Sequence, residues 1–370
     1  MSGRYPAMPI SKTGLSESRP DFRFRRGRGR VELFVMTLML LAGRGAEAQE
    51  SRSWQDASKH QVKFVTVGEG VRLEVLDWGG AGRDVVLLAG YNTAHIFDEF
   101  AEVLSQACHV YGITRRGYGA SSRPDSGYTA KRSAADVLEV LAALKLRAPV
   151  LAGHSFGGQD LSTIGAEHSE RIGALVYLNS AEDPTLGAGL WPAIGVDPSE
   201  LDALRKRLPG TMQAGPAPPD HRSFQAYRAW QARAQGIVFP EAELRQLFVS
   251  NSDGTMGWSA APSWVRDAIF QGKQKPAYAS IRVPVLAFFA YAGTLADYET
   301  QYQPQTSDER AALERNHAIH LAIVKKHIRD LTDGVPAARV IEVPKANYYI
   351  FLSNQDLVLR EMRAFLEALR

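Results

Sequence analysis

The sequence predicts an α/β fold in which a mostly parallel central sheet carries helices on both faces. From Gln61 onward, short apolar segments alternate with segments of helix length, which is the pattern of strands joined by crossover helices. A serine bracketed by glycines, in the segment 153–157, directly follows one of these apolar segments. The alternation breaks over 184–280 and then resumes. Together these observations predict one large core with a long insertion.

The expected strands are short apolar runs, and the first two form a hairpin through 68–70. In chain order the strands are 61–67, 71–77, 84–88, 109–114, 148–152, 172–178, 283–289 and 339–343. The expected helices are longer, and 133–146 shows Ala, Val and Leu at helical spacing. In chain order the helices are 97–106, 133–146, 159–168, a helix within 307–332, and 354–368.

The segment 184–280 predicts a helical lid over a substrate pocket, because it lies between two sheet strands and is rich in aromatic residues. It divides the core into a first part, 61–183, and a second part, 281–370, with 49–60 as a linker ahead of them. The insertion contains Trp191, Trp230, Trp258 and Trp264. An alternative is that these tryptophans only hold the insertion's own small core.

The N-terminal residues 1–48 predict a basic region followed by a secretory signal peptide. A basic stretch at 23–30 precedes an apolar run at 33–42 and a small-x-small site at 46–48. The apolar run is too short for a stable membrane span. We therefore expect export to the periplasm or the exterior, or a cytoplasmic location if this signal is not used. Cys108 is the single cysteine, so no internal disulfide can form.

The net charge of +3 gives a misleading picture of the part of the chain that follows the leader. Residues 1–31 hold eight Lys or Arg against Glu17 and Asp21, which leaves 35 basic and 38 acidic residues in the remainder. Nucleic-acid binding requires a basic face on the folded part of a protein. A slightly acidic remainder therefore excludes nucleic acid from the expected partners.

Ser155 lies where a sharp turn is expected between a strand and a helix. Gly153 and Gly157 stand two residues before and two residues after it, and such a turn leaves no room for side chains at those positions. The turn presents the serine hydroxyl near the free N–H groups at the start of the helix. A serine placed in this way can act as a nucleophile when a base accepts its proton.

Three further segments match motifs that accompany such a turn. Leu87 to His95 follows a strand as an oxyanion loop does, and Arg116 to Ser121 is similar to an R-G-x-G-x-S motif. Asn347 to Leu352 follows the last strand, where a catalytic histidine is expected. With the serine turn, these segments resemble the α/β-hydrolase superfamily, in its serine-nucleophile, lid-containing and esterase-like branch. The resemblance covers roughly Gln61 to Arg370.

The resemblance implies a role for each matching residue. Ser155 is the nucleophile, and the backbone N–H groups of Tyr91 and Phe156 form the oxyanion hole. Asn92 and His95 lie in the same loop as Tyr91 and are expected to contact the substrate. No metal or organic cofactor is implied, because no His, Cys and Asp residues have ligand spacing.

The sequence departs from the family at the catalytic histidine. Tyr348 occupies the expected position, and none of the nine histidines lies in the final loop. A phenol with a reference pKa near 10 is only about one part in a thousand ionised at pH 7, so it is a poor base. His95 is the nearest alternative base, although a histidine in such a loop more often satisfies backbone groups.

Three carboxylates are candidates for the acid that would orient the base. Glu182 and Asp183 follow the strand 172–178, and Asp297 follows the strand 283–289. Asp183 is the preferred candidate. Each of the three also has an ordinary interpretation as a surface carboxylate or a cap.

These observations lead to two hypotheses about function. The first is a serine hydrolase that cleaves an ester, thioester or lactone of a small apolar molecule through an acyl-serine intermediate, with turnover impaired by the missing histidine. The second is a catalytically inactive relative that binds a small ligand or a partner. If Tyr348 is an isolated change in a competent enzyme, Tyr348→His should restore hydrolysis.

Overall fold

The computed structural model describes residues 54–208, 218–298 and 304–369. The predicted signal peptide, 1–48, lies outside these residues. Residues Met8–Ala57 group apart from the rest of the chain, and their described part, 54–57, contains no helix or strand. The fold begins at Ser58.

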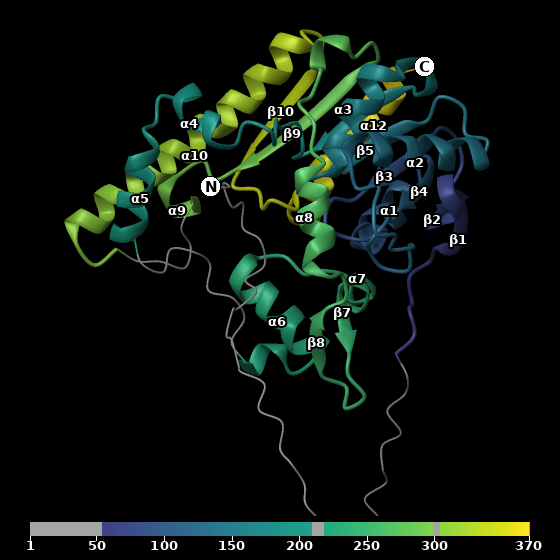
Figure 1. Ribbon diagram of the computed structural model, residues 1–370, viewed down its shortest axis with the longest axis horizontal. Coiled ribbons are helices and arrows are strands. Elements are labelled where there is room, and N and C mark those ends of the chain that lie inside the picture. The colour runs from purple at the N-terminus through teal and green to yellow at the C-terminus, as the bar shows by residue number, and fades with distance from the viewer. Residues whose placement is uncertain (1–53, 209–217, 299–303, 370) are drawn as a thin grey trace, which may run out of the picture. The chain divides into compact units, whose positions relative to one another are not determined.

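The fold is built on an eight-stranded sheet with the order β1-β2-β4-β3-β5-β6-β9-β10 (Figure 1). Strand β2 pairs antiparallel with β1 and β4, and the remaining neighbours are parallel. The strands are β1 (Gln61–Val67), β2 (Val71–Gly79), β3 (Asp84–Leu88), β4 (His109–Ile113), β5 (Val150–His154), β6 (Ala174–Leu178), β9 (Val285–Tyr291) and β10 (Arg339–Pro344). This arrangement confirms the predicted α/β class and the mostly parallel sheet.

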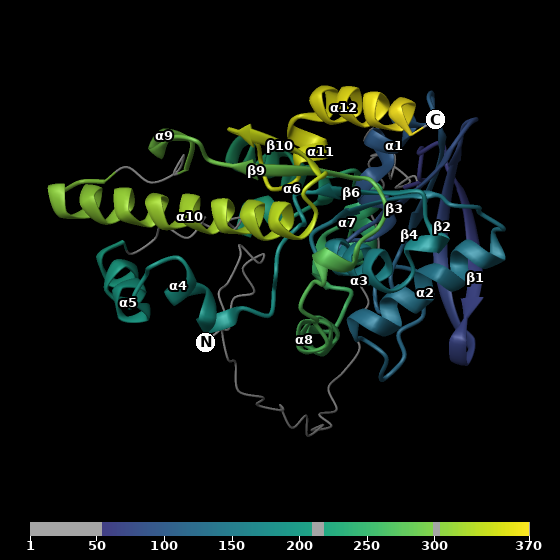
Figure 2. The same ribbon diagram turned by 90° about the horizontal axis from the view of Figure 1, so that it is seen from above.

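Helices cover both faces of the sheet, and Figure 2 shows α1 and α12 on one side with α2 and α3 on the other. The bounds are α1 (Asp98–Leu104), α2 (Ala130–Ala143), α3 (Gly157–Glu167), α10 (Ser307–Gly334), α11 (Ile350–Ser353) and α12 (Gln355–Ala368). Strand side chains alternate between the two layers, as expected for period-two geometry. In β3, Val85 and Leu87 belong to the core beneath α1 and α12, whereas Val86 and Leu88 pack toward α2 and α3.

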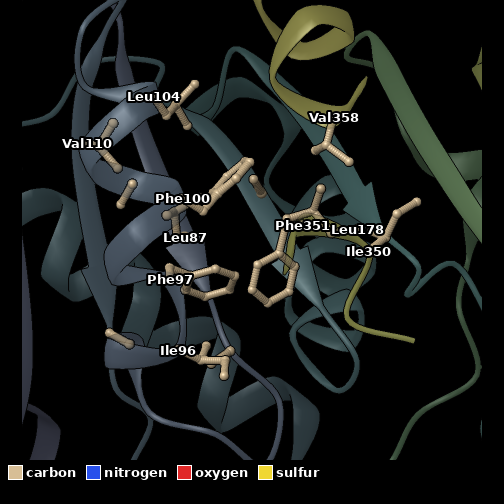
Figure 3. Close-up of a cluster of buried hydrophobic side chains, with 14 of the residues drawn as sticks. Leu87, Ile96, Phe97, Phe100, Leu104, Val110, Leu178, Ile350, Phe351 and Val358 are labelled. Carbon is tan, nitrogen blue, oxygen red and sulfur yellow. The ribbon is translucent and has the colours of Figure 1, made fainter. Parts of the chain in front are cut away.

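The core on the α1 and α12 side is rich in phenylalanine (Figure 3). Phe351 of α11 packs against Phe97 and Phe100, with ring centroids 4.7 and 5.8 Å apart. All three rings are fully buried. Because Phe351 lies three residues after Tyr348, this packing anchors the final loop to the same core that supports the sheet.

The strand that leads to Ser155 was predicted two residues too early. Ala148 has a positive φ of 48°, and Pro149 offers no N–H to a neighbouring strand. The strand therefore begins at Val150 and continues through Gly153 and His154.

The insertion between β6 and β9 is not a uniform helical layer. It contains α4 (Leu190–Ala193), α5 (Pro198–Arg207), α6 (Phe224–Gln235), α7 (Glu241–Leu247), the hairpin strands β7 (Phe248–Ser250) and β8 (Met256–Ser259), and α8 (Ser263–Gln271). Helices α4 and α5 pack on α10, apart from α6, α7 and the hairpin (Figure 1). The four tryptophans do not share one core: Trp191 packs near α10, Trp230 joins the main core and Trp258 is 80% exposed. Across the described ranges, no helix combines the length and apolar character needed to cross a membrane.

Candidate active site

Ser155 stands at a strained turn between β5 and α3. Its φ is 54°, in the left-handed region that side-chain-bearing residues rarely adopt. A Cβ on Gly153 would lie 2.9 Å from the carbonyl of Gly157, and a Cβ on Gly157 would lie 2.3 Å from the carbonyl oxygen of Leu88. Both glycines are therefore required for strand and helix to pass this closely. The side chain of Ser155 is half-buried at the point where helix α3 begins.

The loop after β3 lies directly against Ser155. A Cβ on Gly90 would lie 2.7 Å from Oγ of Ser155 and 2.8 Å from the backbone nitrogen of Phe156. The guanidinium of Arg115 donates to the carbonyl oxygen of Ala89 at 3.3 Å and pairs with Asp160 of α3 at 2.8 Å. This buried ion pair holds the loop and the helix start together. Tyr91 and Phe156, whose backbone N–H groups are the predicted oxyanion donors, pack together here with their rings 4.7 Å apart.

Tyr348 meets Ser155 from the final loop. Burial and the negative charge of Glu182 raise the pKa of the Tyr348 phenol well above its ordinary value, and a hydrogen bond with the Ser155 side chain partly opposes that rise. The carbonyl of Tyr348 accepts hydrogen bonds from Nε2 of His154 at 3.1 Å and from Nδ2 of Asn179 at 3.4 Å. The group beside Ser155 is therefore a well-anchored neutral phenol.

Two nearby histidines have roles other than base. His154 is fully buried, and burial lowers the pKa of its ring to about 4. Its Nε2 must carry the proton because the Tyr348 carbonyl can only accept. Burial disfavours a charged ring at His95 too, but the carboxylates of Asp98 and Glu74 outweigh it and raise the pKa of His95 to about 10.

The structure thus corrects the expectation for His95. It is only 3% exposed, and its ring nitrogens lie 3.4 Å from Asp98 and 3.5 Å from Glu74. A protonated imidazole cannot accept the proton of a serine, and a buried one offers no surface to a substrate. His95 instead balances buried negative charge beneath the loop.

His60, His95 and Asp98 have the composition of a metal site, and their candidate ligand atoms lie within 4.8 Å of one another. Their contacts also suit an ion-pair cluster. Asp98 accepts hydrogen bonds from Nδ1 of His60 at 2.9 Å and from the indole N–H of Trp78 at 3.2 Å. These contacts hold the carboxylate of Asp98 in place.

Among the three candidate acids, Asp183 and Asp297 are engaged in local turns, whereas the charge of Glu182 acts on the phenol of Tyr348. The carboxylate of Asp183 accepts from the backbone N–H of Thr185 at 2.9 Å and from its hydroxyl at 2.6 Å, which closes a local turn. Asp297 closes a similar turn with Thr294. Burial is the main cause of the raised pKa values of Tyr348 and Tyr91, and the charge of Glu182 adds to both. Sequence order alone did not distinguish the two neighbouring carboxylates.

The end of the insertion adds an aromatic wall to this site. The ring of Phe270 in α8 lies 6.4 Å from that of Phe156, and Nζ of Lys273 sits 3.5 Å from the centroid of the Phe270 ring. The side chain of Gln159 in α3 accepts a hydrogen bond from the backbone of Gln274 at 2.8 Å. These contacts attach α8 and the following segment to the helix that begins beside Ser155.

The structure reveals two further polar residues that no sequence motif indicated. Asn179 has a φ of 55° at the end of β6, and its Oδ1 accepts from the backbone N–H of Ala290 at 2.9 Å. Glu243, in α7, is fully buried and accepts a hydrogen bond from Nδ2 of Asn92 at 2.8 Å. Asn92 is therefore engaged inside the protein, and the hydroxyl of Tyr349 donates to its Oδ1 at 3.1 Å.

Comparisons with known proteins agree with this architecture. Residues 85–361 match the model of the alpha/beta hydrolase family. The non-heme chloroperoxidase of Streptomyces lividans is 34% identical over 125 residues, which cover 33% of this chain and 45% of that protein. The N-formylmaleamate deformylase of Pseudomonas putida is 31% identical over 143 residues, covering 38% of this chain and 52% of that protein.

The chain therefore spans about half the length of these curated relatives. Among solved structures, E-2-(acetamidomethylene)succinate hydrolase superposes with a TM-score of 0.58 at 20% identity, covering 83% of this chain and 99% of that one. At this level of identity, the likeness shows a shared fold.

Proposed function

The chain belongs to the α/β hydrolase family, and on that premise we propose that it is a serine hydrolase which forms an acyl-serine intermediate at Ser155. The proposed substrates are esters, thioesters or lactones of small apolar molecules. The observation that supports this most strongly is the positive φ of Ser155, together with a loop that approaches its Oγ so closely that only glycine fits at position 90. Such strain is typical of a site where one hydroxyl must be presented for reaction.

In the proposed reaction, Oγ of Ser155 attacks the carbonyl carbon and the carbonyl oxygen becomes an oxyanion. The backbone N–H groups of Phe156 and Tyr91 would bind that oxyanion, and the helix start at Phe156 adds a favourable dipole. The aromatic wall of Tyr91, Phe156 and Phe270 suits an apolar acyl or alcohol group. The leaving alcohol takes a proton, and water then hydrolyses the acyl-serine.

Proton transfer is the slow step of the proposed reaction. Tyr348 must lose its own proton before it can accept one from Ser155, and its raised pKa leaves far less than about one part in a thousand ionised at pH 7. Loss of one member of a catalytic triad costs on the order of 10⁴- to 10⁶-fold in rate. We therefore expect slow turnover with a normal mode of substrate binding.

Tyr348 also supports a second candidate function, a binding protein without turnover. Its neutral phenol is fixed beside Ser155 and can hold a carbonyl ligand by donating a hydrogen bond. Such a protein would use the same amides and the same aromatic wall but would release its ligand unchanged.

The two functions separate in one experiment with a p-nitrophenyl ester of a short fatty acid. The full chain is exposed to the ester, nitrophenol release is followed, and intact mass spectrometry detects any acyl group on Ser155. Hydrolysis predicts an acyl-serine and slow continuous release, both absent in Ser155→Ala. Ester binding without an adduct on Ser155 would favour the binding protein and contradict the hydrolase.

A further inference from the structure

We infer that Glu243 is a positioning residue, which ties helix α7 of the insertion to the two loops that flank Ser155. This inference rests on the proposed function, because it assigns Glu243 a task in holding the nucleophile's surroundings. Glu243 itself does not reach the reacting atoms. It contacts Asn92 and Thr93, and Asn92 in turn contacts Tyr349.

The contacts of Glu243 converge on the loop after β3. Its Oε1 accepts from Nδ2 of Asn92 at 2.8 Å and from the backbone N–H of Thr93 at 3.2 Å. Its Oε2 accepts from the hydroxyl of Thr93. Glu243 and Thr93 are fully buried and Asn92 nearly so, so water does not compete for these bonds. Three residues upstream of Thr93, Gly90 lies against Oγ of Ser155.

Asn92 extends the link to the final loop. While its amide nitrogen donates to Glu243, its Oδ1 accepts from the hydroxyl of Tyr349 at 3.1 Å. Tyr349 directly follows Tyr348, whose phenol lies beside the Ser155 side chain. The ring of Tyr349 is further fixed against Phe239, at a centroid distance of 4.7 Å. One buried carboxylate therefore connects the insertion to both walls of the candidate site.

The donor pattern favours an ionised Glu243. The amide of Asn92 and the backbone N–H of Thr93 can only donate to its carboxylate, whereas the Thr93 hydroxyl can either donate or accept. Burial raises the pKa of Glu243 to about 7, while the bonds from Thr93 and Asn92 and the positive charge of His95 hold it down. The phenol of Tyr349, in the final loop, also faces this carboxylate, and burial together with the charge of Glu243 raises the pKa of that phenol.

Through Glu243, helix α7 of the insertion holds the surroundings of Ser155 in place without contributing a reacting group. With the carboxylate ionised, the loop after β3 and the final loop are both held in place. Protonation below neutral pH removes the charge that strengthens these hydrogen bonds and so loosens both loops together. The reactivity of Ser155 should therefore fall as pH drops through about 7, in addition to any effect of the base.

The test compares Glu243→Gln with Glu241→Gln in the full-length protein. Glu241 lies on the same helix but pairs with Arg245 at the surface, so it controls for a changed charge in α7. Hydrogen exchange measured by mass spectrometry should show at least tenfold faster exchange in both 90–93 and 347–349 for Glu243→Gln, and no change for Glu241→Gln. Faster exchange confined to α7 would overturn the inference, because it would mean that Glu243 only stabilises its own helix.

A second readout follows labelling of Ser155 by a fluorophosphonate between pH 5.5 and 8.5. The wild-type rate should show an inflection near pH 7 that Glu243→Gln lacks, with a rate at pH 8 at least tenfold below wild type. An unchanged pH profile in Glu243→Gln would overturn the inference. If no variant labels at all, the proposed hydrolase fails, and the exchange data still decide the role of Glu243.

Tyr349→Phe is a milder variant in case Glu243→Gln does not fold. It removes one hydroxyl and no volume, and so cuts only the link between Asn92 and the final loop. Exchange should then accelerate in 347–349 and remain unchanged in 90–93. Equal acceleration of both segments, or of neither, would contradict the proposed chain of contacts.

Discussion

The turn at Ser155 and the final loop around Tyr348 meet at the candidate site. They differ in what each contributes to it, backbone geometry in one case and a side chain for proton transfer in the other. At the turn, backbone conformation and close glycine packing place the Ser155 side chain beside the start of helix α3. The final loop is anchored just as firmly, through His154, Asn179 and Phe351, yet the side chain that it delivers is a phenol. The comparison teaches that different residues determine the geometry of the site and its capacity for proton transfer. Backbone contacts hold the geometry, whereas one side chain decides the proton chemistry.

The largest expected effect comes from supplying the missing base. Tyr348→His should raise the rate of p-nitrophenyl ester hydrolysis by about 10⁴-fold at pH 7.5, because an imidazole there is a competent proton acceptor. Tyr348→Phe is the matched control and should give no gain. An absence of gain in a folded Tyr348→His protein would show that the turn, too, has lost a catalytic feature.

The turn itself should be intolerant of one extra methyl group. Gly157→Ala would place a Cβ 2.3 Å from the carbonyl oxygen of Leu88, and neither backbone segment can easily move. We expect a loss of about 3 kcal/mol in the free energy of unfolding, measured by urea titration. Gly189→Ala, where a Cβ meets open space, should stay within about 0.5 kcal/mol. Similar midpoints for the two variants would refute the packing argument.

The identity of the acid can be tested in the Tyr348→His background. Glu182→Gln should lower the restored rate by about 10²-fold, because its charge acts on position 348 and would favour the imidazolium that forms during reaction. Asp183→Asn should lower it less than about threefold, since Asp183 is occupied with Thr185. The reverse order would restore Asp183 as the acid.

The wild-type pH profile should differ in shape from that of the histidine variant. A base is active when deprotonated, and the pKa of Tyr348 is raised well above its ordinary value. Above the range in which Glu243 titrates, wild-type hydrolysis should therefore rise by about tenfold per pH unit up to at least pH 9.5. Tyr348→His should level off near pH 7. A wild-type plateau near pH 7 would indicate another base.

Local sequence patterns predicted the sheet and the turn because both depend on neighbouring residues. Apolar runs located the strands, and Gly153 and Gly157 defined the serine turn without any long-range information. The start of the strand before the turn was missed by two residues, since Ala148 adopts a positive φ ahead of Pro149. Boundaries depend on single-residue conformations that apolar periodicity does not report.

The remaining site could not be predicted, because it depends on contacts between distant segments. Asp183 and Glu182 are adjacent in sequence, and only the structure shows that Asp183 closes a local turn with Thr185. Likewise, nothing near Glu243 in the sequence indicates that its partner lies in the loop after β3, about 150 residues away. The hairpin within the insertion was also missed, since its strands are only three and four residues long.

The central claim is that Ser155 retains a complete nucleophile and oxyanion geometry and lacks only a base. The most direct measurement is fluorophosphonate labelling of the wild-type protein and of Tyr348→His, side by side, with the modified residue identified by mass spectrometry. Our account predicts an adduct on Ser155 in both proteins, forming orders of magnitude faster in the histidine variant. Folded proteins that carry no adduct on Ser155 in either form would contradict it.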